Sequence, residues 1–333
     1  MTAPQYFLFT VSDESWKEHF ATGIAAINDP GHDPNNRQGN AQRQKAFCEL
    51  AGIKNGDPLF FYLQQQKKIM GLYESASRPF YDTRCLVSKG FINRKFPVRV
   101  AFNQKINFPV PVGMDEVWNS KDKGFFWSLQ QQRGDSVGRH ACIALTKQDG
   151  DHLLRMLYEK NPVIPNLIKI RNKAHSLRGL PYDFSHDGNQ LHYEAVLQSV
   201  LLEDFKQGKH KEVFGDYDYF VPFFPTSSQK EIDVLLFKHD SRGVLWYEIL
   251  ELKQHAFDQE ELNKLMNYED WVLNTLSDGN IRMVHSIGIA NEFADDVKAY
   301  IKGRIGYGGR KIRLIKYSFN AKRKALSLTE ESL

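Results

Sequence analysis

The chain has 333 residues, of which 41% are hydrophobic and 13% aromatic, so a disordered chain is excluded and two domains are expected. It holds no run of about eighteen apolar residues and no basic segment before its first apolar stretch, so we expect neither a transmembrane helix nor a secretory signal. The net charge of +4 permits a polyanionic partner, and three scattered cysteines predict reduced thiols in a cytoplasmic protein without a zinc site or a disulfide framework.

Residues 1–160 are predicted to form a β-rich α+β domain with a few short helices. Short apolar or alternating runs bounded by turn residues indicate the strands, and a helix is expected to end before Asn161-Pro162. The expected strands are 6–11, 58–63, 68–75, 98–102 and 141–145, and the expected helices are 42–51 and 150–159. Residues 161–188 contain three prolines and no long periodicity, which predicts a linker.

Residues 189–333 alternate between helical and strand-like patterns. The expected helices are 190–205, 259–276 and 293–302, and the expected strands are 231–237, 244–253, 282–290 and 311–319. Such alternation predicts an α/β domain with a mixed central sheet.

The strands 231–237 and 244–253 are joined by a short loop, which predicts a β-hairpin. Asp233 lies early on the first strand, and Glu251 and Lys253 lie late on the second. Side chains two residues apart on a strand leave the same face, and a hairpin brings the start of one strand beside the end of the next. These three groups should therefore converge. Because buried carboxylates are costly unless they are paired or bind a cation, the pattern points to a divalent metal.

This arrangement resembles the core of the PD-(D/E)xK nuclease superfamily, in which an Asp is followed by Glu-x-Lys on the next strand, here Glu251-Leu252-Lys253. Ile232 replaces the family's proline, and Glu194 stands on the preceding helix, where the family tends to place a glutamate. The resemblance implies a restriction-endonuclease-like fold. It also implies Mg²⁺, or Mn²⁺ as a substitute, held by Asp233, Glu251 and Glu194. Lys253 would orient the attacking water or stabilise the charge that develops on the phosphate.

A less specific interpretation of the same residues stays open. Glu251 and Lys253 could belong to the solvated face of an edge strand, and Glu194 could be an ordinary exposed helix residue. Related nucleases often carry Gln-Leu-x-x-Tyr on the following helix. Here Lys264 replaces the glutamine ahead of Tyr268, which puts a role for that position in doubt.

The first half of the chain carries a series of short motifs in a definite order. Tyr6-Phe7-Leu8-Phe9-Thr10-Val11 leads to Ser12 and Trp16, then come Gly56-Asp57-Pro58-Leu59-Phe60-Phe61-Tyr62 and Ser77-Arg78-Pro79-Phe80-Tyr81-Asp82. This order resembles the EVE domain, a relative of the YTH and PUA-like domains that bind modified bases. The resemblance implies a pocket that holds a flipped base between aromatic faces and reads it with polar groups. The candidate pocket residues are Trp16, Trp127, Tyr62, Phe80, Tyr81, Ser12 and Asp82. The alternative is that these aromatic residues fill the core of a β-rich domain.

Together the two resemblances imply a modification-dependent restriction endonuclease that acts on double-stranded DNA carrying modified bases. Cutting both strands needs two active sites, which favours a homodimer. One alternative is a DNA-repair or RNA-processing nuclease without modification dependence. A second alternative is a non-catalytic nucleic-acid-binding protein whose acidic cluster holds no metal.

Overall fold

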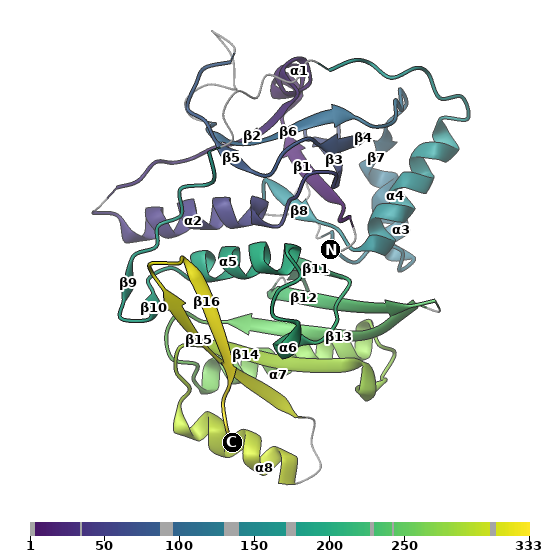
Figure 1. The fold of residues 1–333 in the computed structure, drawn as a ribbon. Coiled ribbons are helices and arrows are strands. Elements are labelled where there is room, and N and C mark those ends of the chain that lie inside the picture. Colours follow the sequence, from purple (N-terminus) through teal and green to yellow (C-terminus); the bar gives the residue numbers. More distant parts are fainter. Residues whose placement is uncertain are drawn as a thin grey trace. The chain divides into compact units, whose positions relative to one another are not determined.

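The computed structural model describes residues 4–33, 35–86, 96–129, 140–170, 178–226, 230–241, 243–306 and 311–333 (Figure 1). The packing divides the chain into two compact units, Pro4–Tyr182 and Asp183–Leu333. The division falls inside residues 161–188, the segment with linker-like sequence. Of the helices in these ranges, none has the length and apolar character needed to span a membrane.

The first unit contains a curled mixed sheet with the strand order β2-β6-β4-β3-β1-β8, to which the short strands β5 and β7 are added at β6 and β4. Its strands are β1 Phe7–Val11, β2 Ile24–Ile27, β3 Pro58–Leu63, β4 Lys68–Ser75, β5 Phe80–Tyr81, β6 Val98–Gln104, β7 Val112–Gly113 and β8 Cys142–Ala144. The pairing of β1 with β3 is parallel, and the other pairings are antiparallel. All five strands expected from the sequence are present.

Four helices accompany this sheet, and side-chain caps set where three of them begin. They are α1 Asp13–Thr22, α2 Arg37–Ala51, α3 Met114–Asp122 and α4 Lys147–Lys160. Ser12, Asn36 and Thr146 cap α1, α2 and α4 by accepting a backbone N–H of the first turn. The cap at Asn36 explains why α2 begins five residues before the predicted start at residue 42. Helix α1, which the sequence reading did not predict, ends at Gly23 in the left-handed region, with φ 63°.

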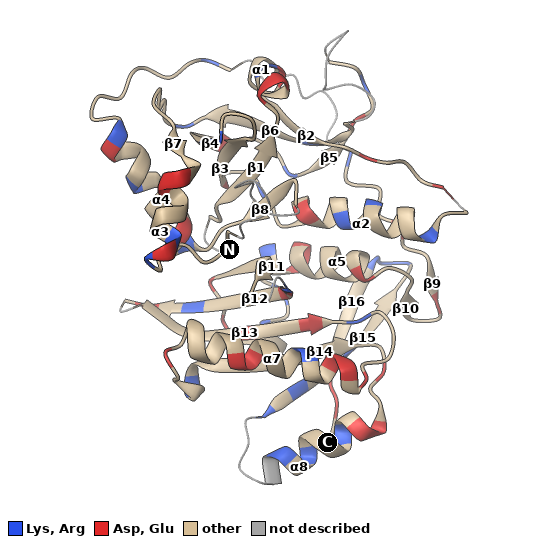
Figure 2. Ribbon diagram, turned by 180° about the vertical axis from the view of Figure 1, so that it is seen from behind, with Lys and Arg blue, Asp and Glu red and all other residues tan. Residues whose placement is uncertain are grey.

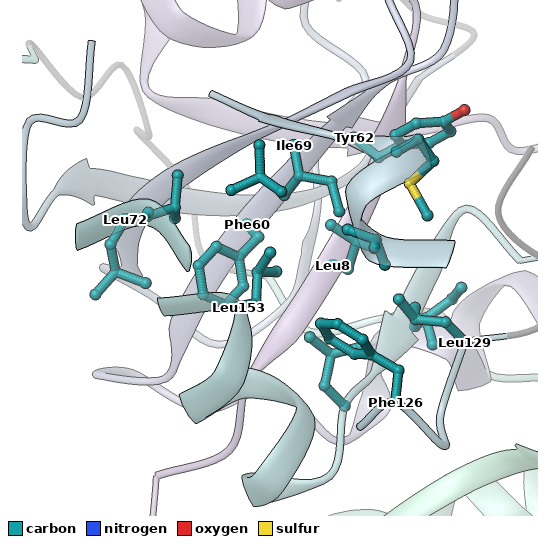
Figure 3. Packing of buried hydrophobic residues seen from close by; sticks show 14 of the residues in the cluster. Leu8, Phe60, Tyr62, Ile69, Leu72, Phe126, Leu129 and Leu153 are labelled. Carbon is teal, nitrogen blue, oxygen red and sulfur yellow. The ribbon is translucent and has the colours of Figure 1, made fainter. Parts of the chain in front are cut away.

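The core of the first unit lies between the sheet and helices α3 and α4 (Figure 3). Leu8, Phe60 and Ile69 from the strands pack against Leu153 of α4. Tyr6 lies directly over α4 at Gly150, where a Cβ atom would come within 2.1 Å of the tyrosine ring. The absence of a side chain at Gly150 therefore allows the close approach of the helix to this ring.

The second unit is built on a six-stranded sheet with the order β11-β12-β13-β14-β15-β16 (Figure 1). The strands are β11 Tyr219–Pro225, β12 Glu231–Asp240, β13 Gly243–Leu252, β14 Val284–Ala290, β15 Ile312–Asn320 and β16 Ala325–Glu330. The pairs β13–β14 and β14–β15 are parallel, and the other pairs are antiparallel. The predicted mixed central sheet is confirmed.

The helices of this unit are α5 Glu194–Lys206, α6 Lys211–Phe214, α7 Gln259–Thr275 and α8 Asp295–Gly306, with a 3-10 turn at Ile281–Met283. Helix α5 begins four residues later than predicted, because Gln190–Leu191 form strand β10 with β9 His186–Asp187. The strand predicted from residue 282 begins at Val284, because the 3-10 turn comes first. Helix α7 packs on β13 and β14, and α5 contacts β13 and β16. Helices α5 and α7 and the end of β13 supply the side chains of the site described next.

Candidate active site

Strands β12 and β13 separate at the end where Asp233 and Glu251 lie. Their backbone pairing runs from Asp240 opposite Gly243 to Val234 opposite Leu250. Beyond that point the Leu252 N–H donates to Asp233 Oδ2 at 2.8 Å, so a carboxylate takes the place of a strand partner. The Asp233 carbonyl oxygen accepts a hydrogen bond from Gln198 Nε2 of α5 at 2.7 Å. The Asp233 side chain is thereby fixed at an opening in the sheet.

Glu251 is completely buried at this opening, and its two carboxylate oxygens have different surroundings. Its Oε1 lies 2.5 Å from Lys264 Nζ and 3.2 Å from Lys253 Nζ. Its Oε2 is buried and accepts no hydrogen bond from the described residues. Burial, and then the charge of Asp233, raise the pKa of Glu251 above its usual value, although the two ammonium groups oppose the shift.

Lys253 is at the centre of the cluster, with 8% of its side chain exposed. Its Nζ donates to Glu194 Oε2 at 3.1 Å and lies 3.6 Å from Glu261 Oε2. Burial alone would lower the pKa of Lys253, but the neighbouring carboxylates, Asp233 first, outweigh burial and raise it. Burial and the charge of Asp233 raise the pKa of Glu194. The lysine is therefore held in its charged form.

The structure brings together the four residues predicted for catalysis, namely Asp233, Glu251, Lys253 and Glu194. Figure 2 shows the acidic segments of α5, β13 and α7 that contribute to the cluster. The sequence analysis did not predict Gln198 and Glu261 for the site, and it left a role for Lys264 in doubt. The signal for the last two was their spacing: Glu261, Lys264 and Tyr268 follow one another at intervals of three and four residues, which places them on one face of α7.

The described residues contain no group of three or more His, Cys, Asp or Glu side chains placed to hold a metal. Mg²⁺ does not require such a group, because it is commonly bound through one or two carboxylates and keeps several waters. Asp233 and Glu251 supply two carboxylates, and the buried Glu251 Oε2 without a hydrogen-bond partner is an oxygen donor of the right kind. The donor set therefore fits Mg²⁺ or Mn²⁺. Glu194 faces Lys253 Nζ, and its role as a metal ligand stays a prediction.

The residues predicted to form a base pocket differ in burial, and some of them belong to the core of the first unit. Tyr62 and Phe80 are each 1% exposed and belong to the core. This burial corrects the prediction for these two residues, since a ring enclosed in the core offers no free face to a base. Trp16 is half-buried, and its ring centroid lies 4.8 Å from that of Phe61. Ser12 caps α1.

The three remaining pocket candidates are tied into polar networks. The Tyr81 hydroxyl donates to Asp29 at 2.7 Å, and Asp82 pairs with Arg84 at 2.6 Å. Trp127 is half-buried, and its backbone N–H donates to the buried Asp149 at 3.0 Å. The bond at Tyr81 involves its hydroxyl group, and the bond at Trp127 involves its backbone N–H. Neither bond uses the flat face of the ring.

A hollow of about 400 Å³ lies at the turn end of the hairpin, lined in part by Asp240, Trp246, Arg282 and Met283. Asp233 and Glu251 lie toward the opposite ends of strands β12 and β13. The hollow is therefore separate from the acidic cluster.

Neither protein-family models nor curated proteins give a match to this chain. Among solved structures, it is similar to a repair endonuclease from Pyrococcus abyssi, with 19% identity, a TM-score of 0.25, and coverage of 40% of this chain and 49% of that one. It is also similar to human THYN1 in complex with 5-methylcytosine-containing DNA, with 16% identity, a TM-score of 0.31, and coverage of 46% of this chain and 97% of that one. A third is a hypothetical protein from Leishmania major, with 14% identity, a TM-score of 0.33, and coverage of 47% and 97%. The chain spans about half of the repair endonuclease. TM-scores this low support no conclusion about function, which has to rest on the residues of the site.

Proposed function

We propose that this protein is a modification-dependent DNA endonuclease whose second unit hydrolyses phosphodiester bonds with Mg²⁺. The observation that carries the proposal is the environment of Glu251. This fully buried carboxylate has one oxygen beside two ammonium groups and the other without a hydrogen-bond partner, at the point where Asp233 opens the hairpin. Buried polar atoms usually have a hydrogen-bond partner, and the unsatisfied oxygen of Glu251 belongs to a carboxylate that also feels the charge of a second acid, Asp233.

Asp233, Glu251 and the backbone carbonyl of Leu252 are the groups that would hold Mg²⁺. When bound, the ion would supply a water of lowered pKa and neutralise charge on the phosphate. Lys253, kept charged by its carboxylate neighbours, would stabilise the negative charge that develops on the scissile phosphate. Glu194 would hold the lysine in place through the 3.1 Å hydrogen bond.

The first unit is proposed to recognise the modified base. Trp16, Trp127 and Tyr81 supply rings that are neither fully exposed nor fully buried, and Ser12 and Asp82 are polar groups nearby in sequence. Stacking on such rings contributes about 1–3 kcal/mol per base. Two copies of the chain would be needed to cut both strands of a duplex.

The direct test is cleavage of plasmids with and without methylated or hydroxymethylated cytosine, in Mg²⁺ or in EDTA. We expect cutting that is confined to modified DNA and lost in EDTA. Asp233→Asn and Lys253→Met should each lower the cleavage rate by about a thousandfold or more, a loss in the range seen when a catalytic group is removed. Lys298→Gln is the control, because it breaks a 2.9 Å ion pair with Glu331 outside the site. Full activity in EDTA, or in both site variants, would refute the proposal.

A repair nuclease without modification dependence is the second candidate. The burial of Tyr62 and Phe80 in the core favours it, because two of the seven residues expected around a base are occupied elsewhere. Equal cutting of modified and unmodified plasmids, still abolished by Asp233→Asn, would establish this second function. Unequal cutting that becomes equal in Trp16→Ala or Trp127→Ala would exclude it.

A further inference from the structure

Lys264 occupies a distinct position within the acidic cluster. It lies on α7, and 29% of its side chain is exposed, compared with 8% for Lys253. The Lys264 Nζ lies 2.5 Å from Glu251 Oε1, whereas the Lys253 Nζ lies 3.2 Å from the same oxygen. Among the described residues, Glu251 is the single carboxylate with which Lys264 forms an ion pair.

The two lysines differ in how firmly they are held. Lys253 Nζ lies within 3.6 Å of carboxylate oxygens of Glu194, Glu251 and Glu261, so losing one partner leaves it two others. Lys264 has an ion pair with Glu251, feels the charge of Asp233, and has a contact over the Tyr268 ring, 5.6 Å from the ring centroid. A partly exposed lysine has a flexible four-carbon stem and a strongly hydrated head group, so it can turn to solvent once another positive group replaces it beside Glu251.

A divalent cation held by Asp233 and Glu251 Oε2 would share the Glu251 carboxylate with the Lys264 ammonium, which lies at Oε1. Glu251 is completely buried, so its charged form needs a nearby positive group. Lys264 fills this need when no cation is bound. A cation held by Asp233 and Glu251 would supply the charge instead, and it would repel the ammonium group at short range.

Building on the proposed function, we propose that Lys264 is an exchangeable counter-ion: it pairs with Glu251 in the cation-free protein, is displaced when the cation binds, and then contacts a DNA phosphate. Before cation binding, Lys264 thus positions the Glu251 carboxylate. After cation binding, it contacts the phosphate backbone of the DNA. No covalent step is involved.

The first test is Mn²⁺ binding to the full-length protein without DNA, measured by calorimetry. Lys264→Gln removes the competing charge and should bind Mn²⁺ about tenfold more tightly than wild type, whereas Lys264→Arg should stay close to wild type. Lys298→Gln is the matched control, since Lys298 has a 31% exposed side chain and a carboxylate partner at 2.9 Å. Its Mn²⁺ affinity should not change. Circular dichroism would verify folding, with Lys264→Met as the replacement if Lys264→Gln does not fold.

The second test is DNA binding with Ca²⁺, which allows binding to be measured with cleavage suppressed. In Ca²⁺, Lys264→Gln should bind DNA several-fold more weakly than wild type, and the salt dependence of its affinity should fall by about one phosphate contact. In EDTA the two proteins should bind DNA equally, because Lys264 is then held by Glu251. A residue with a purely structural role would not show this dependence on the cation.

Two outcomes separate this inference from the proposed function. If wild type binds Mn²⁺ and Lys264→Gln binds it no more tightly, the inference is overturned and the proposed nuclease is unaffected. If neither protein binds Mn²⁺ or Ca²⁺, both are overturned. An equal loss of DNA affinity in Ca²⁺ and in EDTA would also contradict the exchange, since it would make Lys264 a permanent DNA contact.

Discussion

Strand β13 carries two buried acids three residues apart, Glu248 and Glu251, on opposite faces of the sheet. Glu251 lies beside two ammonium groups. Glu248 has Arg313 at 3.5 Å, and its Oε2 has no hydrogen-bond partner among the described residues. The same strand thus offers an acid within the proposed site and an acid remote from it, so the cost of burial can be measured without disturbing the chemistry.

Burial raises the pKa of Glu248 from its usual 4.5 to about 8, against the opposing effect of Arg313. Between these two pH values the folded state keeps a proton that the unfolded state has lost. Stability contributed by the protonated acid is therefore present below about pH 4.5 and is lost as the pH rises through about 8. Glu248→Gln should match wild type near pH 4 and exceed its free energy of unfolding by about 1–3 kcal/mol near pH 9. Urea unfolding across this range measures the difference, and a difference independent of pH would contradict the expectation.

Glu194 allows its two suggested roles to be told apart. If it positions Lys253, Glu194→Gln should lower the cleavage rate by about tenfold, while Mn²⁺ affinity changes little. If it is a direct ligand, the same variant should lose Mn²⁺ affinity as strongly as Asp233→Asn does. The 3.1 Å contact with Lys253 Nζ leads us to expect the first result. Parallel calorimetry and cleavage measurements on both variants decide between the two roles.

At the scale of single elements, α4 and the Tyr6 ring form one of the tightest contacts in the first unit. Gly150→Ala would place a Cβ atom 2.1–2.7 Å from three ring atoms of Tyr6. The ring would have to move, losing its 2.8 Å hydrogen bond to Asp151 and its stacking on Phe60. We expect a loss of about 1–3 kcal/mol in the free energy of unfolding, in spite of the better helix propensity of alanine.

Gly303 on α8 is the control for this substitution, because a Cβ atom there meets nothing within 4 Å. Gly303→Ala should stabilise the protein by about 0.5–1 kcal/mol through helix propensity alone. Thermal or urea unfolding of the two variants compares them directly. Equal effects at both positions would show that the Tyr6 contact is not restrictive.

The elements that could be predicted from the sequence are those whose patterns are local. The hairpin that carries Asp233 and Glu251 is present, since its alternation and its turn both lie within about twenty residues. The sequence analysis does not predict strands β2, β5, β7, β9, β10, β11 and β16. The two-residue strands β5 and β7 are defined by pairing with distant β6 and β4, which no local pattern encodes.

The same distinction applies to the residues of the site. Asp233, Glu251 and Lys253 were predictable because strand geometry fixes their relative placement. Lys264 departs from the glutamine of the related motif, so the sequence leaves its role in doubt, yet its Nζ lies 2.5 Å from Glu251 Oε1. The burial of Tyr62 and Phe80 could not be predicted from the sequence either, because an aromatic residue in a core and one in a pocket give the same sequence pattern.

At the scale of the whole molecule, the predicted catalytic residues all lie in Asp183–Leu333 and the predicted base-reading residues all lie in Pro4–Tyr182. A ligand that binds only the folded state stabilises it, by about 2.7 kcal/mol at a hundredfold excess over the dissociation constant. Saturating Mg²⁺ should therefore raise the unfolding temperature of the wild-type protein, and EDTA should reverse the effect. Asp233→Asn should show no such rise in differential scanning calorimetry. A rise of equal size in Asp233→Asn would place the ion elsewhere.

The hydrogen bond from the Leu252 N–H to Asp233 Oδ2 gives the protein a built-in reporter. The amide proton of Leu252 is held by the carboxylate that is proposed to bind the cation, and not by a carbonyl of the facing strand. Its exchange with solvent deuterium should therefore respond to the occupancy of the site, while amides held by backbone pairing between Val234 and Leu250 should not. One backbone amide could thus be used to follow cation binding in protein that is not turning over substrate.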